Sequence, residues 1–86
     1  MNTYEIWLES CAKQPNIKLW LLEDSPPYVL FELVELDTEL QSSNNYNYRF
    51  VNYHIWNTET GEWIVNNNYL TAYNKYKRLL AVKAKV

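Results

Sequence analysis

Residues 46–66, YNYRFVNYHIWNTETGEWIVN, contain the clearest structural pattern in this chain of 86 residues. A run rich in Tyr, Phe, Val and Ile ends at Trp56, and another short apolar run follows Gly61, the only glycine. Aromatic and β-branched residues favour strands, and a polar loop that contains glycine favours a turn between them. We therefore predict a β-hairpin with strands at 46–56 and 61–66.

The length of the loop sets the register of this hairpin. It brings Trp56 opposite Trp63 as a cross-strand aromatic pair. Gly61 can take a positive φ in the loop, and Asn57 can hydrogen-bond the turn backbone. Because side chains alternate along a strand, the hairpin has two different faces. One face carries Phe50, Asn52, His54, Trp56, Trp63 and Val65, and the other carries Val51, Tyr53, Ile55 and Ile64. Both faces are apolar, which predicts either a central hairpin or one face kept for a partner.

Two further strands precede the hairpin. The segment IKLWLL at 17–22 is bounded by Pro-Asn and by Glu-Asp-Ser-Pro-Pro, which predicts a short strand between turns. The segment YVLFELVEL at 28–36 predicts a second strand, because Tyr, Val and Phe gather at its start. A helix is the alternative for 28–36, since Ser25-Pro26 suits a helix start and Leu and Glu favour helices.

Helices are predicted at both ends of the chain, at 3–13 and 68–82. Each has a stripe of apolar residues at helical spacing. The first stripe is Tyr4, Trp7, Leu8 and Cys11, and the second is Tyr69, Tyr73, Tyr76 and Leu80. Asn2 or Thr3 is the expected cap of the first helix, and Asn68 that of the second. A strand over TYEIWL is the alternative for the first helix.

These elements predict one α+β domain over residues 1–86, with an antiparallel sheet of about four strands and a helix at each end. Cys11 is the only cysteine, so no disulfide can form within the chain. The longest apolar stretches, 19–22 and 28–31, are far shorter than the roughly 20 residues that span a membrane. We therefore expect a cytoplasmic protein without a membrane segment.

The residues that usually carry catalysis or bind metals are scarce. His54 and Cys11 are the only residues of their types, whereas structural zinc sites need four such ligands. Cys11 on an apolar stripe is typical of a buried residue, and His54 beside Trp56 is typical of a packed one. The acidic segment 32–39 is more simply a solvated strand edge than a cation site. We expect no enzymatic activity, no metal and no cofactor.

Charge is distributed unevenly along the chain. Residues 1–40 contain eight acidic and two basic side chains, whereas residues 41–86 contain two acidic and six basic ones. The simplest interpretation is that the two halves attract each other within the fold. Alternatively, either half attracts a charged partner, which includes a second copy of the chain in a homodimer.

Protein binding is the function that the sequence favours. Trp, Tyr and Arg are enriched at interface hot spots, and a small aromatic-rich domain suits an adaptor, a subunit or an inhibitor. Phages and other mobile elements are one source of such small regulators. The partner expected is a protein of unknown identity. The candidate contact residues are Phe50, His54, Trp56 and Trp63.

Binding of single-stranded nucleic acid is the alternative function. Unpaired bases would stack on sheet aromatics, while the basic C-terminal helix neutralised the phosphates. The candidate residues are Tyr48, Arg49, Lys75, Lys77 and Arg78. The isoelectric point near 5.3 and the lack of a recognisable single-strand-binding motif make this function less favoured.

Overall fold

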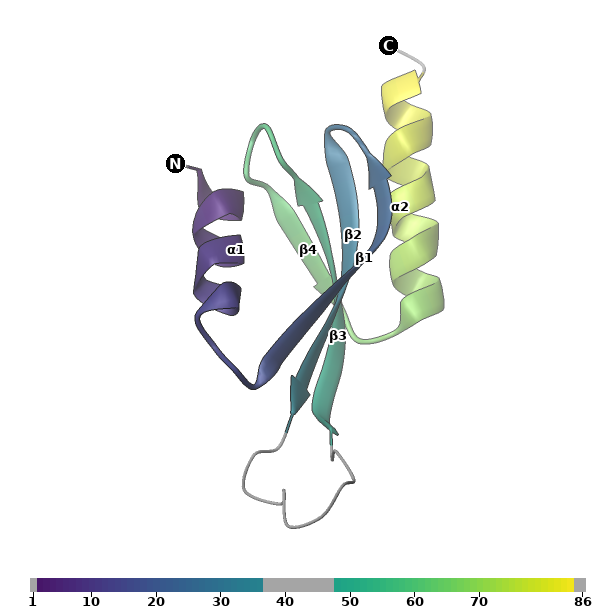
Figure 1. Cartoon of the computed structure of the whole chain (residues 1–86). Coiled ribbons are helices and arrows are strands. Elements are labelled where there is room, and N and C mark those ends of the chain that lie inside the picture. The colour runs from purple at the N-terminus through teal and green to yellow at the C-terminus, as the bar shows by residue number, and fades with distance from the viewer. Residues whose placement is uncertain (1, 37–47, 85–86) are drawn as a thin grey trace.

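The computed structural model describes residues 2–36 and 48–84, and for residues 48–50, 83 and 84 it describes the backbone only. The elements are α1 (Thr3–Ala12), β1 (Ile17–Ser25), β2 (Tyr28–Leu36), β3 (Tyr48–Asn57), β4 (Trp63–Asn66) and α2 (Tyr69–Ala84). The strands form one antiparallel sheet in the order β1-β2-β3-β4. The two helices lie on opposite sides of this sheet (Figure 1). The predicted α+β fold is confirmed.

The first strand is longer than predicted and ends closer to the second, which has the predicted bounds. Segment 28–36 is a strand that pairs with both β1 and β3, so the helical alternative is wrong. β1 continues beyond residue 22, because Glu23, Asp24 and Ser25 pair with the start of β2 after an irregularity near Leu22. The turn therefore contains only a Pro-Pro pair, joined by a cis peptide bond.

The hairpin of β3 and β4 has the predicted register. Trp56 pairs with Trp63, and their rings stack with centroids 5.7 Å apart. Gly61 has a φ of +79°, and the Asn57 side chain accepts hydrogen bonds from the N–H groups of Glu59 and Thr60. β4 begins at residue 63 instead of 61, because this turn occupies the two preceding residues. The predicted strand positions 46 and 47 lie outside the described residues.

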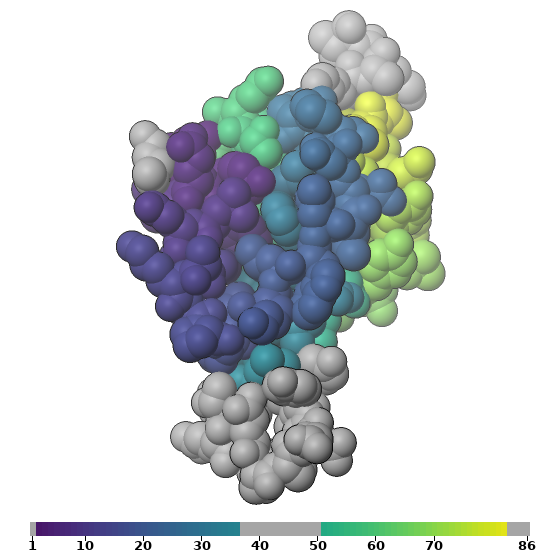
Figure 2. Space-filling view, viewed as in Figure 1, coloured from purple at the N-terminus to yellow at the C-terminus, as the bar shows by residue number. Residues whose placement is uncertain are grey.

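Asparagine caps begin both helices. The Asn2 side chain accepts a hydrogen bond from the N–H of Glu5, and that of Asn68 accepts one from the N–H of Thr71, each at 3.0 Å. Asn2 also donates to the carbonyl of Thr58 at 2.7 Å, which fixes the start of α1 to the β3–β4 loop. The space-filling view shows this loop, in green, beside the start of α1, in purple (Figure 2). The alternative strand over TYEIWL is wrong.

Each face of the sheet has its own apolar core. Leu30 and Ile55 pack with Ala72 and Tyr76 of α2, and all four are at most 2% exposed. On the opposite face, the buried residues Val29, Phe31 and Trp56 pack against α1. Leu19 of β1 and the α1 residues Tyr4, Trp7 and Leu8 complete this second core. The alternation of side chains predicted for the hairpin is confirmed over residues 53–56 and at Trp63 and Ile64, and one helix packs on each face.

Candidate functional site

Trp7 of α1 is the centre of an aromatic cluster on one face of the sheet. Its ring stacks on His54 at 4.9 Å between centroids and lies 5.1 Å from the ring of Trp56. An edge contact with Phe31, at 5.5 Å, ties it to the middle of β2. These contacts fix Trp7 and leave little rotamer freedom to the rings that it touches.

Trp63 extends this cluster to the edge of the sheet. Its ring stacks on Trp56, which is only 2% exposed, yet Trp63 itself is 54% exposed. Nearby, Ile6 of α1 is 54% exposed, and Val65, two positions along β4 on the same face, is 38% exposed. We call the exposed side chains of Ile6, Trp63 and Val65 the α1–β4 surface.

A groove of about 310 Å³ separates α1 from the hairpin and opens at this surface. Its lining residues are Thr3, Ile6, Trp7, Ser10, His54, Trp56 and Trp63. Aromatic and aliphatic side chains predominate, and none of these described residues carries a full charge at neutral pH. Thr3 and Ser10 supply hydroxyl groups along the α1 wall. Such a lining suits apolar side chains of a partner.

His54 is held as a neutral aromatic ring. Burial lowers its pKa from 6.5 to about 4, so the imidazole carries no charge at neutral pH. Its Nδ1 is buried without a hydrogen-bond partner in the described part of the chain, and so is Nε1 of Trp56. A catalytic histidine normally has a group that orients it, and residues 2–36 and 51–82 provide none here.

Cys11 lies apart from the groove. It is 7% exposed, and burial raises the pKa of its thiol, so the sulfur is an unreactive apolar atom at neutral pH. Its predicted burial is confirmed. Within residues 2–36 and 51–82, no three His, Cys, Asp or Glu side chains converge as metal ligands. Asp37 and Glu39 of the acidic segment lie outside the described residues.

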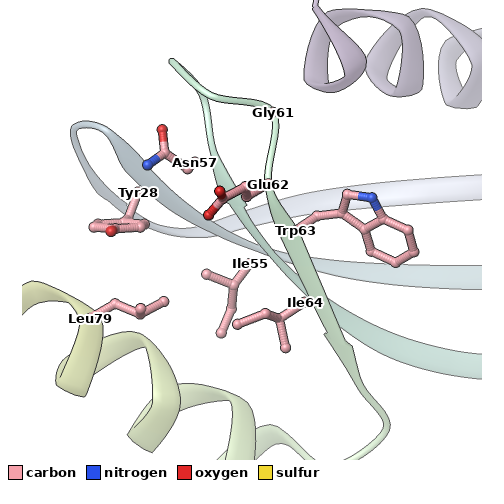
Figure 3. A pocket seen from close by; sticks show the side chains of 8 residues that line it. All are labelled: Tyr28, Ile55, Asn57, Gly61, Glu62, Trp63, Ile64 and Leu79. Carbon is pink, nitrogen blue, oxygen red and sulfur yellow. The ribbon is translucent and has the colours of Figure 1, made fainter.

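A second hollow, of about 420 Å³, lies on the other face, between α2 and the hairpin. Figure 3 shows Leu79 of α2 facing Ile55 and Ile64 across it, while the ring of Trp63 points away from them. Tyr28, Asn57, Gly61, Glu62 and Trp63 complete its lining. This opposite orientation of Trp63 and Ile64 shows that β4 presents a different apolar side chain to each face.

The predicted basic residues lie on the side of the sheet opposite the groove. Lys75, Lys77 and Arg78 are exposed on α2, and Nζ of Lys77 lies 5.8 Å from the ring centre of Tyr73. His54 and Trp56 face α1 instead. The fold therefore separates these cations from the rings of His54 and Trp56, whereas the ring of Tyr53 lies on the α2 side, 5.6 Å from that of Tyr69. The side chains of Tyr48 and Arg49 lie outside the described residues.

The structure brings together three of the four residues predicted for protein binding. His54, Trp56 and Trp63 all line the groove, although Trp56 is buried and supports Trp63 from beneath. The side chain of Phe50 lies outside the described residues. Ile6 and Val65 were not predicted. The available signal for Ile6 was its position as an apolar residue off the buried stripe of α1.

Comparisons with known proteins found no matching family model, no significantly similar curated protein and no significantly similar solved structure. Among residues 2–36 and 48–84, no helix has both the length and the apolar character needed to cross a bilayer.

Proposed function

We propose that this protein is a small, non-catalytic binding module that contacts another protein through the α1–β4 surface. The observation that carries the proposal is Trp63, which is 54% exposed while its ring is stacked on the buried ring of Trp56. A rigid, half-exposed Trp at the centre of an apolar surface has the character of an interface hot spot.

The supporting contacts reduce the entropy lost on binding. Trp63 rests on Trp56, and Trp56 is in turn in contact with Trp7, so the anchor is ordered before the partner arrives. Covering its exposed half removes on the order of 100 Å² of apolar surface from water. At about 25 cal/mol per Å², this corresponds to about 2.5 kcal/mol from one side chain.

The chemistry of the groove defines the partner. Apolar side chains would fill the space between Ile6 and Trp63, and the hydroxyls of Thr3 and Ser10 would hydrogen-bond polar groups at its margin. An adaptor, a subunit or an inhibitor would each use such a surface. We place this role in the cytoplasm, because the one thiol is buried and no disulfide stabilises the fold.

Site-specific photocrosslinking tests the proposal. A benzophenone side chain at Ile6, on the surface, is compared with one at Leu70, which is 63% exposed on α2. Irradiation in the source cell should give a discrete protein adduct from position 6. When Trp63→Ala is added to the protein that carries the crosslinker at position 6, the yield of that adduct should fall at least tenfold. Val82→Ala, added in the same way at another exposed α2 position, should leave the yield unchanged.

Two outcomes would contradict the proposal. Adducts of equal yield from positions 6 and 70, insensitive to Trp63→Ala, would show that the α1–β4 surface has no selective role. Adducts to RNA or DNA alone would favour the alternative of nucleic-acid binding, and a salt-dependent affinity for single-stranded oligonucleotides would then be measured.

A further inference from the structure

Within the described part of the chain, no strand pairs with the outer edge of β4. The N–H of Asn57 donates to the carbonyl of Glu62 at 2.9 Å, which identifies this residue pair as hydrogen-bonded across the hairpin. Hydrogen-bonded and non-hydrogen-bonded pairs alternate along an antiparallel ladder. Ile64 therefore directs its backbone groups toward β3, and Trp63 and Val65 direct theirs away from the sheet.

The two edge strands differ in how they discourage further pairing. β1 contains an irregularity near Leu22 and the charged residues Lys18, Glu23 and Asp24, features that protect sheet edges. β4, Trp63–Asn66, contains no charge, no proline and no bulge. Of the two edges in the described sheet, β4 is the one open to another strand.

We propose that β4 pairs antiparallel with β4 of a second copy of this chain, about a two-fold axis at Ile64. This inference rests on the proposed function and names the partner. In an antiparallel pair, directly opposite side chains lie on the same face of the sheet. In a symmetric pair the two-fold axis must therefore lie between two copies of the same residue, since adjacent residues point to different faces. With the axis at Ile64, each Trp63 lies opposite the Val65 of the second copy. The outward backbone groups of these two residues then bond each other.

This register is self-complementary on both faces. On the α1 face, it covers Trp63 and Val65, the two exposed apolar side chains of the strand, with each other. On the α2 face, Ile64 meets its own copy. Glu62 lies opposite Asn66, so no like charges face each other. An axis at Val65 would instead place Trp63 opposite the exposed polar residue Asn67.

Sedimentation velocity over a range of protein concentrations tests for this dimer. We expect a reversible dimer with twice the chain mass of 10.4 kDa. The dimer should persist at high salt, because strand pairing and apolar contact form it. Val65→Lys should weaken dimerisation at least 100-fold, since it replaces the apolar side chain opposite each Trp63 by a cation. The matched control is Val82→Lys, since Val82 is 64% exposed on α2, and it should leave dimerisation unchanged.

Disulfide crosslinking tests the register in a Cys11→Ala background. Ile64→Cys places its thiol at the axis, where directly opposed Cα atoms of a non-hydrogen-bonded pair lie about 4.5 Å apart, within disulfide range. Mild oxidation should crosslink this variant through its own copy. Val65→Cys lies opposite Trp63 and should crosslink at least tenfold more slowly. Faster crosslinking at 65 than at 64 would overturn the register.

Two further results would overturn the inference. A dimer that dissociates with added salt and is not weakened by Val65→Lys would be held by attraction between the acidic half of one copy and the basic half of the other. A monomer at all concentrations would exclude pairing between copies. If the Trp63-dependent adduct from position 6 persists with a monomer, the proposed function stands and β4 binds a strand of another protein. If that adduct is also lost, both proposals fail.

Discussion

The two faces of the sheet are covered to different extents, although both are rich in aromatic residues. α2 has 16 residues and encloses a core in which Leu30 and Tyr76 are at most 1% exposed. α1 has 10 residues and covers Trp56, but it leaves Trp63 half exposed at the neighbouring strand. Each face thus has a hollow beside the hairpin, but only the α1 face continues from its groove to a half-exposed tryptophan that is stacked on a buried one. The difference teaches that aromatic content alone does not distinguish a core from a surface.

The largest expected effect separates the two stacked tryptophans of the α1 face. Trp56→Ala should lower the free energy of unfolding by about 3–5 kcal/mol, because it removes a fully buried ring. Trp63→Ala should lower it by less, by about 2 kcal/mol, because only about half of that ring is buried in the folded state. Urea unfolding followed by far-UV circular dichroism, at one low protein concentration, measures both. Equal losses would show that Trp63 belongs to the core.

The next effect concerns the loop that joins the hairpin to α1. Gly61→Ala should destabilise the protein by about 1–2 kcal/mol, because a φ of +79° is unfavourable for alanine. The added Cβ would also lie 3.3 Å from Cβ of Thr3. Gly61→Asn is the matched control, since it adds the same Cβ but tolerates a positive φ better. The thermal unfolding midpoint should be highest with glycine at position 61, lower with asparagine and lowest with alanine. Equal midpoints for the two variants would assign the loss of stability to the contact of the added Cβ with Thr3.

A smaller effect, of opposite sign, is expected on the α2 face. The hydroxyl of Tyr76 is buried and has no hydrogen-bond partner in the described part of the chain. Tyr76→Phe removes this polar group and should stabilise the protein by about 1 kcal/mol. Tyr73→Phe, at a partly exposed position of the same helix, should change stability by less than about 0.5 kcal/mol. A loss of stability in Tyr76→Phe would mean that the hydroxyl is hydrogen-bonded.

A pH dependence of stability is also expected to originate on the α1 face. The pKa of His54 is about 4 in the folded protein and 6.5 in the unfolded chain, so between these values the unfolded state binds more protons. Stability from this group is complete above pH 6.5 and decreases as the pH falls toward 4. The slope stays below the one-proton limit of about 1.4 kcal/mol per pH unit, because the ring is partly solvated.

Comparison with His54→Gln isolates this contribution from that of the carboxylates. Urea midpoints of the two proteins at pH 7, 6, 5 and 4 should converge as the pH falls, since glutamine does not titrate. Parallel curves for the two proteins would show that burial does not perturb the histidine.

Local patterns were sufficient for most of the fold. The hairpin register followed from the loop length, and the Asn68 cap and the positive φ open to Gly61 followed from their positions. For the first helix the sequence left Asn2 and Thr3 as alternative caps, and the cap is Asn2. The errors occurred at strand ends. Residues 23–25 resemble a turn by composition, yet they pair with β2, because a neighbouring strand supplies hydrogen bonds that local propensity does not include.

The candidate site was predictable only in part. His54, Trp56 and Trp63 were identified because aromatic residues gather on one face of the hairpin. The sequence could not show which of the three is buried and which is exposed, because all three point to the same face of the hairpin. Ile6 joins them only because α1 packs across this face and brings it to the groove beside Trp63.

The sequence by itself determined which residues share a face, because the periods of a strand and a helix fix the direction of each side chain relative to its neighbours. It also determined the turn and the caps, which depend on contacts a few residues apart. Only the tertiary structure decided which helix covers which face, that β4 lies at an edge, and that Trp63 stays half exposed. These features depend on packing between distant segments, and such packing leaves no local period in the chain.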